Sequence, residues 1–547
     1  MAQMKKIHVR NGFDKDEAYN YYPVLIIGAG ESGIAMGCQL KRKLNFSQFR
    51  IFDRQAGIGG TWWINRYPGV ACDIPTALYS FSFAPNYQSK RVYPSGPEFV
   101  EYLENVASNY QITDNIQCNT DIGELRWIDD DEEWEITIRH LVPGTGDLST
   151  KERQQRVRDH GEESVYLRHE KARAKVVVSC VGILVEPNAW PESIPGLSTF
   201  SGEVIHSARW RKDVDLAEKH VVVLGAGCSA AQIVPKLLEP SAKVKSVTQI
   251  MRTPPWVIPR IQEIGGVEAY SRNAPKIFRF LPFLGPMFRA FLFVFVEAVW
   301  FTVFQEKNKM LRKYSENFAL SHMKSLAPEK YHEMMTPKYA YGCKRRVFDQ
   351  DWLASMNSPK FTLTTQRIET LDAKQAVLGP SKDGKASGTE STTRISADVI
   401  VLANGFEATR WLHPLKVYGR SGKLLQEVWE ERGGPQAYMG TATDGFPNFF
   451  LVGGPNTFVG HTSVILASEN LIGYILRIIK PVLRAEARFV EPKRDAEINW
   501  TKEVQQKLKK TVFSRSCGGF YKDENGWNST MYPYVSMRGC LMITGVC

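Results

Sequence analysis

Two stretches of the chain begin with a run of apolar residues, pass through a glycine-rich turn and continue with the apolar spacing of a helix. They are VLIIGAGESGIAMGCQL at 24–40 and VVVLGAGCSAAQIVPKL at 221–237. An unbroken apolar run before a turn is typical of a buried parallel strand, and the spacing after it is typical of an amphipathic helix. Each stretch therefore predicts a strand–turn–helix unit.

Both turns carry the glycine spacing of dinucleotide-binding loops. In the first loop, Gly28 permits the tight turn, Gly30 lets the backbone approach a pyrophosphate, and Gly33 lets the helix pack on the strand. Gly225 and Gly227 hold the first two of these positions in the second loop. The helix that follows each loop presents its N-terminus to the negative charge of a pyrophosphate. The alternative is that the glycines only turn the chain.

The residues at the ends of the next strands distinguish the two loops. The strand FRIFD ends in Asp53, at about the spacing where a carboxylate binds ribose hydroxyls. After the second loop, VKSVTQIM is followed by Arg252 and Thr253. A carboxylate there would repel a ribose 2′-phosphate, whereas arginine pairs with it bidentately. The first site therefore predicts FAD and the second NADPH, with Ser229 as a further NADP contact. The alternative for Arg252 is a solvated strand-end cation.

The rest of the chain indicates an α/β protein with two Rossmann-like dinucleotide-binding domains and a helical insertion. The proline-rich PNAWPESIPGL marks a linker, the polar segment 140–175 reads as a surface hairpin or loop insertion, and ADVIVLANGF reads as a return to the first domain. We expect an FAD-binding domain at 20–184 and 396–547, the latter with a C-terminal extension, an NADP-binding domain at 185–258 and 336–395, and a helical subdomain at 259–335.

One apolar run, AFLFVFVEAVWFTVF at 290–304, tests whether the protein contacts a membrane. It contains Glu297 and is shorter than the ~20 residues that a membrane-spanning helix needs. We expect a buried helix that lines the route of a lipophilic substrate, without stable membrane insertion. A membrane-surface element is the alternative.

Composition and charge exclude several classes of protein. The chain has 547 residues, of which 43% are hydrophobic and 23% charged, as in globular proteins of two to four domains. Its net charge of +11 suits an anionic partner, but the Lys and Arg residues are spread along the chain, so we expect a phosphorylated cofactor and no nucleic acid. The nine cysteines form neither a CxxC pair nor a zinc-like spacing, which predicts no metal site and no disulfide framework. The N-terminus lacks an apolar leader, so we expect a cytoplasmic protein.

Several longer motifs resemble those of Baeyer–Villiger monooxygenases. GIGGTWWINRYPGVACD at 57–73 is similar to the family segment GGTWxxNRYPGxxxD, and FSGEVIHSARW at 200–210 fits FxGxxxHxxxW. The resemblance continues through RTPPWVIP, YGCKRRVFD and FPNFFLVGGPN. Arg211 stands where the family usually has Pro or Asp, and Asn404 replaces a frequent Thr.

This resemblance implies a reaction and a catalytic pair. In the family, NADPH reduces FAD, dioxygen gives a C4a-peroxyflavin, and this species attacks the carbonyl of a ketone to yield an ester or lactone. A fixed cation would stabilise the resulting oxyanion, and arginine does not lose its proton near neutral pH. By resemblance, Arg345 is the active-site arginine and Asp73 the carboxylate that holds it. The alternatives are a surface arginine and a helix-capping aspartate.

The resemblance also implies roles for residues around the pair. Thr61, Trp62, Asp73, Ile74 and Tyr79 are similar to flavin-contacting positions, with core packing as the alternative for the two aromatic residues. Lys344 resembles a residue that helps to bind the 2′-phosphate, with a solvated lysine as the alternative. His206 resembles a residue that connects the domains, with a hydrogen-bonded structural histidine as the alternative.

The predicted function is therefore NADPH- and FAD-dependent oxidation of an apolar ketone by O2. A flavin monooxygenase that oxidises nitrogen or sulfur shares the two loops but does not need the Asp73–Arg345 pair. A flavin disulfide reductase would need a redox cysteine pair, which the sequence lacks. A non-catalytic dinucleotide-binding redox sensor is the alternative from another class. The sequence predicts neither the particular ketone nor the oligomeric state.

Overall fold

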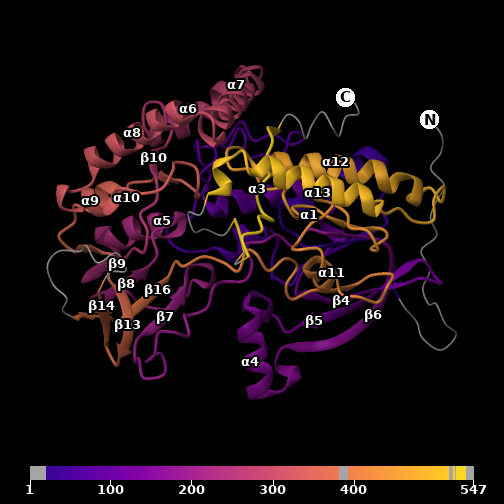
Figure 1. The fold of residues 1–547 in the computed structure, drawn as a ribbon, viewed down its shortest axis with the longest axis horizontal. Helices are drawn as coiled ribbons and strands as arrows, with labels where there is room; N and C mark the ends of the chain where they lie inside the picture. Colours follow the sequence, from indigo (N-terminus) through magenta and orange to yellow (C-terminus); the bar gives the residue numbers. More distant parts are fainter. Residues whose placement is uncertain (1–19, 381–391, 516–520, 524, 537–547) are drawn as a thin grey trace.

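The computed structural model describes residues 20–380, 392–515, 521–523 and 525–536 (Figure 1). Two separate sheets, each next to one of the glycine loops, organise this part of the chain. Helices α6–α9 lie along one edge of the molecule, above the second sheet in Figure 1. This arrangement confirms the predicted α/β class with two dinucleotide-binding sheets and a helical region.

The first sheet has eight strands in the order β17-β4-β5-β6-β1-β2-β3, with β18 also paired to β6. Strands β1, β2, β3 and β18 run parallel to their neighbours, whereas β4, β5 and β6 form an antiparallel meander. Their bounds are β1 (Asn20–Ile27), β2 (Phe49–Phe52), β3 (Ile116–Gln117), β4 (Thr120–Ile128), β5 (Glu133–Leu141), β6 (Tyr166–Ser179), β17 (Lys416–Tyr418) and β18 (Phe449–Leu451).

Helices cover the parallel part of this sheet because its central strand is apolar on both faces. Val24, Leu25 and Ile26 of β1 have no exposed surface. Val24 and Ile26 belong to one core cluster with residues of α1, α3 and α12, and Leu25 faces a second cluster on the meander side. The helices of this half are α1 (Glu31–Leu44), α2 (Thr61–Ile64), α3 (Gly96–Asn109), α4 (Thr150–His160), α11 (Leu425–Glu431), α12 (Val464–Leu483) and α13 (Arg494–Leu508).

The second sheet is fully parallel, in the order β12-β9-β8-β16-β7. Its strands are β7 (Glu203–His206), β8 (His220–Leu224), β9 (Ser246–Ile250), β12 (Phe361–Thr364) and β16 (Val399–Leu402), with α5 (Cys228–Leu238) and α10 (Trp352–Ser355) packed on it. A small antiparallel sheet of β13 (Arg367–Asp372), β14 (Gln375–Gly379) and β15 (Thr393–Ser396) adjoins it, and β10 (Val257–Pro259) pairs with β11 (Val347–Asp349).

The helical region consists of α6 (Val267–Phe280), α7 (Leu284–Val299), α8 (Lys309–Leu326) and α9 (His332–Met335). A π-helical turn, Trp300–Phe304, continues α7. The predicted burial of 290–304 is wrong in part. Leu292, Glu297 and Trp300 are buried, but Phe291 is 67% exposed and Phe295 57% exposed.

The strand in ADVIVLANGF belongs to the second sheet, so its expected assignment to the first domain is wrong. Val399–Leu402 pairs in parallel with both β8 and β7. A buried apolar strand that ends near a glycine fits either sheet, and only the pairing distinguishes them. The chain rejoins the first sheet at β17. The other domain boundaries stay predictions.

Candidate active site

The first glycine loop joins β1 to α1 in a conformation that side chains would prevent. Gly28 has a φ of +104°, and a Cβ atom there would lie 2.5 Å from the carbonyl oxygen of Cys180. A Cβ on Gly33 would lie 1.8 Å from the carbonyl oxygen of Gly28. Gly30 caps α1 without a side-chain hydrogen bond, so the first N–H groups of the helix are left for a ligand. This backbone cradle fits the pyrophosphate of FAD.

Asp53 is bound to the same loop. It follows β2 and is buried, and its Oδ2 accepts a hydrogen bond from the amide of Ala29 (2.6 Å) while Oδ1 accepts one from the amide of Gln55 (2.8 Å). Burial raises the pKa of Asp53. The carboxylate therefore braces the loop, and each oxygen keeps a second lone pair for a ribose hydroxyl.

Glu31, the first residue of α1, is a feature of this loop that the motif did not single out. Its Oε1 accepts hydrogen bonds from the hydroxyls of Ser32 and Ser468 (both 2.8 Å), and its buried Oε2 has no partner in the described part of the chain. Burial raises the pKa of Glu31 to about 7. Above this pH the carboxyl group becomes an anion beside the expected pyrophosphate site.

FAD binding is therefore expected to weaken as pH rises through 7. The raised pKa means that the carboxyl group is neutral below pH 7 and charged above it, and the charge repels the pyrophosphate. We expect FAD affinity of the wild type to fall about 10-fold from pH 6 to pH 8, which is about one pKa unit of interaction. Glu31→Gln should remove most of this fall, as measured by quenching of flavin fluorescence. Glu268→Gln, at an exposed site, is the control, and the same pH dependence in both variants would refute the role of Glu31.

The expected flavin contacts gather between the first loop and the second sheet. Trp62, in α2, donates a hydrogen bond from Nε1 to the hydroxyl of Tyr79 (3.2 Å), and the two rings meet edge to face at 5.7 Å. The hydroxyl of Thr61 accepts a hydrogen bond from Asn65 (3.2 Å), and Ile74 packs against the core of the first half. A cavity of about 470 Å3 borders Trp62, but Asp73 and Arg345 do not line it. The roles of these residues as flavin contacts stay predictions.

The second glycine loop joins β8 to α5 in the same way. Gly225 has a φ of +130°, and a Cβ atom there would lie 2.3 Å from the carbonyl oxygen of Ala403. A Cβ on Gly227 would meet open space, and Gly227 caps α5 without a side-chain hydrogen bond. Ser229 lies in the first turn of α5. This loop also fits a pyrophosphate.

Two cations from distant parts of the sequence lie near each other beyond this loop. Arg252 is exposed after β9, and Lys344 lies in the loop before β11. Burial lowers the pKa of Lys344, and the charge of Arg252 lowers it further. Neither cation forms an ion pair with a carboxylate in the described ranges. Two such cations suit a ribose 2′-phosphate, and Thr253 directly follows Arg252 in sequence.

Asp73 and Arg345 form an ion pair that links the two halves of the molecule. Nη2 of Arg345 donates a hydrogen bond to Oδ2 of Asp73. The side chain of Arg345 is 35% exposed and that of Asp73 is 21% exposed, so the pair is shielded from bulk water yet open to a ligand. The Asp73 carboxylate raises the pKa of Arg345 above its usual value, which keeps the guanidinium charged. Neither expected alternative fits, since Asp73 caps no helix and Arg345 is not freely exposed.

The pair lies beside the second glycine loop. Cys228, the first residue of α5, has its pKa raised to about 11 by burial, and the charges of Asp73 and Arg345 act on it. The Sγ atom of Cys228 lies 3.8 Å from the carbonyl oxygen of Arg346. The guanidinium is thus held at the start of the expected NADP site.

Two further residues near the pair, Arg260 and Tyr521, were not identified by any sequence motif. The guanidinium carbon of Arg260 lies 4.0 Å from the centre of the Tyr93 ring. Burial lowers the pKa of Arg260, although nearby groups that include Asp73 oppose this shift. Burial raises the pKa of Tyr521 to about 12, although the charges of Arg345 and Arg346 oppose this. Both residues come from elements far from the fingerprints, so spacing alone could not find them.

His206 is a hydrogen-bonded structural histidine. Its Nε2 donates to the carbonyl oxygen of Gly405 (3.1 Å), and its Nδ1 accepts from the amide of Ala208 (3.0 Å). Burial lowers the pKa of His206 to about 4. The neutral ring therefore ties β7 to the Asn404–Gly405 turn.

Cys343 is disulfide-bonded, although the spacing of the cysteines predicted no disulfide framework. Cys38, Cys72, Cys118, Cys180 and Cys228 are free thiols. The disulfide lies next to Lys344 and Arg345 in sequence.

Two glycine loops that each fit a pyrophosphate are typical of flavoproteins that also use a nicotinamide dinucleotide. The flavin-binding monooxygenase-like family matches residues 22–284. A Baeyer–Villiger monooxygenase of Pseudomonas aeruginosa is 31% identical over 95% of this chain and 89% of that protein. One of Streptomyces coelicolor is 32% identical over 95% of this chain and 90% of that protein. The chain belongs to the Baeyer–Villiger monooxygenase family and is an NADPH- and FAD-dependent enzyme.

The fold agrees with this assignment. A closed crystal structure of cyclohexanone monooxygenase is 25% identical and covers 96% of this chain and 97% of that chain, with a TM-score of 0.73. An oxidized steroid monooxygenase bound to NADP is 23% identical and covers 96% of this chain and 98% of that chain, with a TM-score of 0.74. The expected family, fold class and cofactors are confirmed.

Proposed function

We propose that this enzyme inserts one oxygen atom next to the carbonyl group of an apolar ketone, with the Asp73–Arg345 pair at its reaction centre. This proposal rests on the ion pair itself. Asp73 lies in the segment after α2, and the pair lies beside the start of α5. A reaction that oxidises nitrogen or sulfur develops no oxyanion on a carbonyl carbon and does not need such a pair.

The residues of the two loops fit the two cofactors. Gly28, Gly30, Gly33 and Asp53 would hold FAD, with Thr61, Trp62, Ile74 and Tyr79 beside its ring. Gly225, Gly227, Ser229, Arg252, Thr253 and Lys344 would hold NADPH. When bound, FAD carries electrons from NADPH to dioxygen and so supplies the activated oxygen atom.

The protein's own contribution is a fixed positive charge. Arg345 would donate hydrogen bonds to the oxygen atoms on which negative charge develops, including that of the ketone carbonyl. Asp73 would orient the guanidinium and limit the cost of burying it, since a buried charge without a partner is strongly destabilising. Arg345 is thus the proposed catalytic residue, and Asp73 positions it.

We also propose a class of substrate and a cellular location. The apolar residues of α7 that pack beside the segment after Asp73 favour apolar ketones over charged ones. The spread of basic residues favours phosphorylated cofactors over nucleic acid as the anionic ligands. We place the enzyme in the cytoplasm, and we assign the domains as predicted except for the strand β16.

Product analysis with the FAD-loaded enzyme, NADPH and oxygen tests the proposal. Linear and cyclic ketones should give esters or lactones, identified by mass spectrometry, with NADPH consumed in step. If amines or sulfides are oxidised while ketones are recovered unchanged, the second candidate, an N- or S-oxygenating flavin monooxygenase, replaces the first. Absence of substrate-dependent NADPH consumption with any of these ketones would contradict the proposal.

A further inference from the structure

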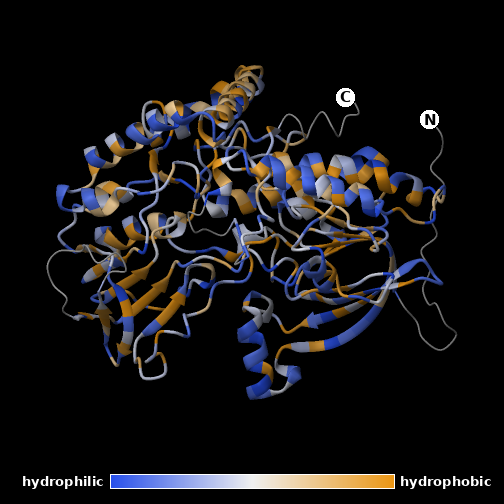
Figure 2. Ribbon diagram, in the orientation of Figure 1, coloured by the Kyte–Doolittle hydropathy of each residue, from blue (hydrophilic) through white to orange (hydrophobic). Residues whose placement is uncertain are grey.

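The outer side of α7 carries an apolar face that no described residue covers. Six side chains on it are more than half exposed: Phe283, Met287, Phe291, Val294, Phe295 and Phe301. Met287, Phe291 and Phe295 are four residues apart, and Val294 and Phe301 are seven and fourteen residues after Met287, so all lie on one helix stripe. Figure 2 shows this hydrophobic helix at the outer edge of the molecule. Exposed apolar patches of this kind mark binding surfaces.

The segment has the length and hydropathy of a membrane helix but is held by the protein along its inner side. Leu284–Phe304 has a mean hydropathy of 1.8 in its most apolar window, only 28% of which is buried. Leu292 packs against Ala77 and Leu78, and Arg289 donates a hydrogen bond to the carbonyl oxygen of Ser80 (3.1 Å). These contacts keep the helix on the protein surface, so it can lie on a bilayer but not cross it.

The buried carboxylate of Glu297 fixes the C-terminal half of α7. Its Oε1 is hydrogen-bonded to Nε2 of His461 (3.3 Å) and accepts a hydrogen bond from the amide of Ser536 (3.2 Å). If α7 left these partners to enter a membrane, the buried charge of Glu297 would be exposed to hydrocarbon, which costs free energy. Glu297, whose charge argued against a membrane-spanning helix, thus anchors α7 to the rest of the protein.

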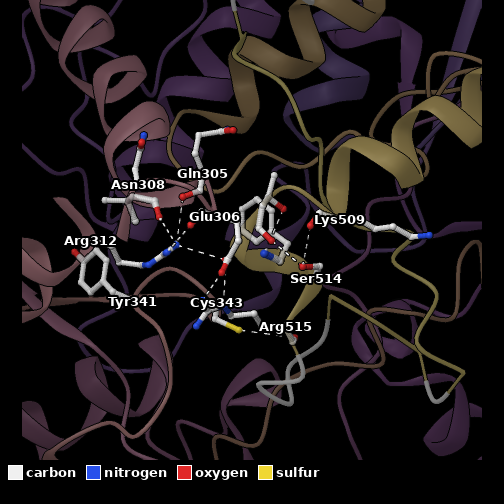
Figure 3. A network of polar contacts seen from close by, with 12 residues as sticks. Gln305, Glu306, Asn308, Arg312, Tyr341, Cys343, Lys509, Ser514 and Arg515 are labelled. Carbon is white, nitrogen blue, oxygen red and sulfur yellow. Dashed lines mark hydrogen bonds and ion pairs between the residues drawn. The ribbon is translucent and has the colours of Figure 1, made fainter. Parts of the chain in front are cut away.

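A network of charged side chains holds the end of the helical segment (Figure 3). Glu306 forms ion pairs with Arg312 and Arg515. Arg312 also donates hydrogen bonds to the carbonyl oxygens of Gln305 (3.4 Å) and Glu306 (3.1 Å). Both ends of α7 are therefore fixed, and its apolar stripe points outward in a set orientation.

The charges around the stripe are nearly all positive. Between residues 264 and 314, six basic side chains are exposed (Arg272, Lys276, Arg279, Lys307, Lys309 and Lys313), whereas Glu268 is the one exposed carboxylate among the residues described there. Arg272, Lys276 and Arg279 recur at helical spacing and so form a basic stripe on α6, which ends at the 79% exposed Phe280. Apolar aromatic residues with basic residues beside them are typical of helices that lie in a lipid interface.

We propose that the α6–α7 surface docks on a bilayer that contains anionic lipids. The apolar stripe would enter the boundary of the acyl chains, and the basic residues would contact the headgroups. A second copy of the chain is a poorer occupant, because a two-fold interface would place the same basic residues against each other. This docking does not depend on the proposed reaction.

Docking would bring the bilayer close to the catalytic pair. The inner side of α7 contacts Ala77 and Leu78, and Ile74 packs beside them, directly after Asp73 in the chain. One helix diameter, about 10 Å, therefore separates the proposed lipid surface from this segment. An apolar ketone that partitions into lipid would be concentrated at the same place.

Vesicle flotation with the full-length FAD-loaded protein tests the docking. We expect the wild type to bind vesicles of phosphatidylcholine mixed with phosphatidylglycerol at least about 10-fold more tightly than vesicles of phosphatidylcholine alone, with the difference reduced at high salt. The double variant Phe291→Ser/Phe295→Ser should lose most binding to both. The triple variant Arg272→Gln/Lys276→Gln/Arg279→Gln should lose the preference for anionic lipid.

Leu167→Ser is the matched control, because Leu167 is 65% exposed on β6, away from α7. All substituted residues are exposed, so the variants should keep the melting temperature and flavin spectrum of the wild type. Equal vesicle binding by the wild type and the Phe291/Phe295 variant would overturn the proposal. So would a lack of vesicle binding together with a dimer, seen by light scattering, that this variant converts to a monomer. Ketone oxidation is measured separately, so its failure would leave the docking result unaffected.

Discussion

Replacing Arg345 with alanine should lower ester formation by at least about 100-fold, as expected when a group that stabilises an oxyanion is removed. FAD should remain bound and NADPH should still reduce it, because the FAD loop does not include Arg345. The electrons would then reach oxygen without oxidising the ketone. We therefore expect continued NADPH consumption with little ester, measured as the ratio of product to NADPH in parallel assays.

Two other variants separate the roles within the pair. Arg345→Lys keeps a positive charge but loses the planar fork, so it should recover only part of the activity. Arg211→Ala, at an exposed ion pair with Glu203 and Asp213, is the control and should behave as the wild type. An Arg345→Ala variant with a normal ester yield would exclude Arg345 from the reaction.

Replacing Arg252 with alanine should weaken NADPH binding by about 10- to 150-fold and leave NADH nearly unaffected. The expected loss is that of a charge-assisted hydrogen bond to the 2′-phosphate, about 1.5–3 kcal/mol. KM values for the two cofactors, with flavin reduction as the readout, measure it. Lys344→Ala should shift the same ratio in the same direction, because its charge lies near that of Arg252.

Arg272→Ala, at an exposed site on α6, is the control for a general change in surface charge. If Arg252→Ala weakens NADPH and NADH equally, the residue contributes to folding or to a shared part of the cofactor and not to the 2′-phosphate site.

The sequence predicted the two sheets well because each glycine loop is specified locally. Gly28 and Gly225 adopt positive φ angles, and Gly33 allows a close approach of helix and strand, so these positions require glycine whatever surrounds them. Asp53 and Arg252 follow the strands next to the loops and could be assigned from spacing. The Asp73–Arg345 pair was found only through resemblance to a family, since no spacing rule links two residues so far apart in sequence.

Features that depend on tertiary contacts were predicted less well. The strand β16 has the same apolar pattern as a strand of the first sheet, and only its pairing with β7 and β8 assigns it. The polar segment 140–175 was expected to be a surface hairpin or loop insertion. Most of β6 lies in it and pairs antiparallel with β5, as in a hairpin, but the helix α4 between the two strands was not predicted. The apolar run in α7 looked like core, yet one of its sides faces solvent. Hydrophobicity alone does not distinguish a core from a docking surface.

The fate of isotopically labelled dioxygen tests most directly whether Arg345 acts in the oxidation of the ketone. The purified enzyme is supplied with FAD, NADPH and a ketone that gives an ester, and the products of the wild type and of Arg345→Ala are compared by mass spectrometry. We expect one labelled oxygen atom in each ester molecule made by the wild type and almost no labelled ester from the variant. Labelled ester at wild-type yield from Arg345→Ala, or unlabelled ketone as the only carbonyl species recovered from the wild type, would contradict this expectation.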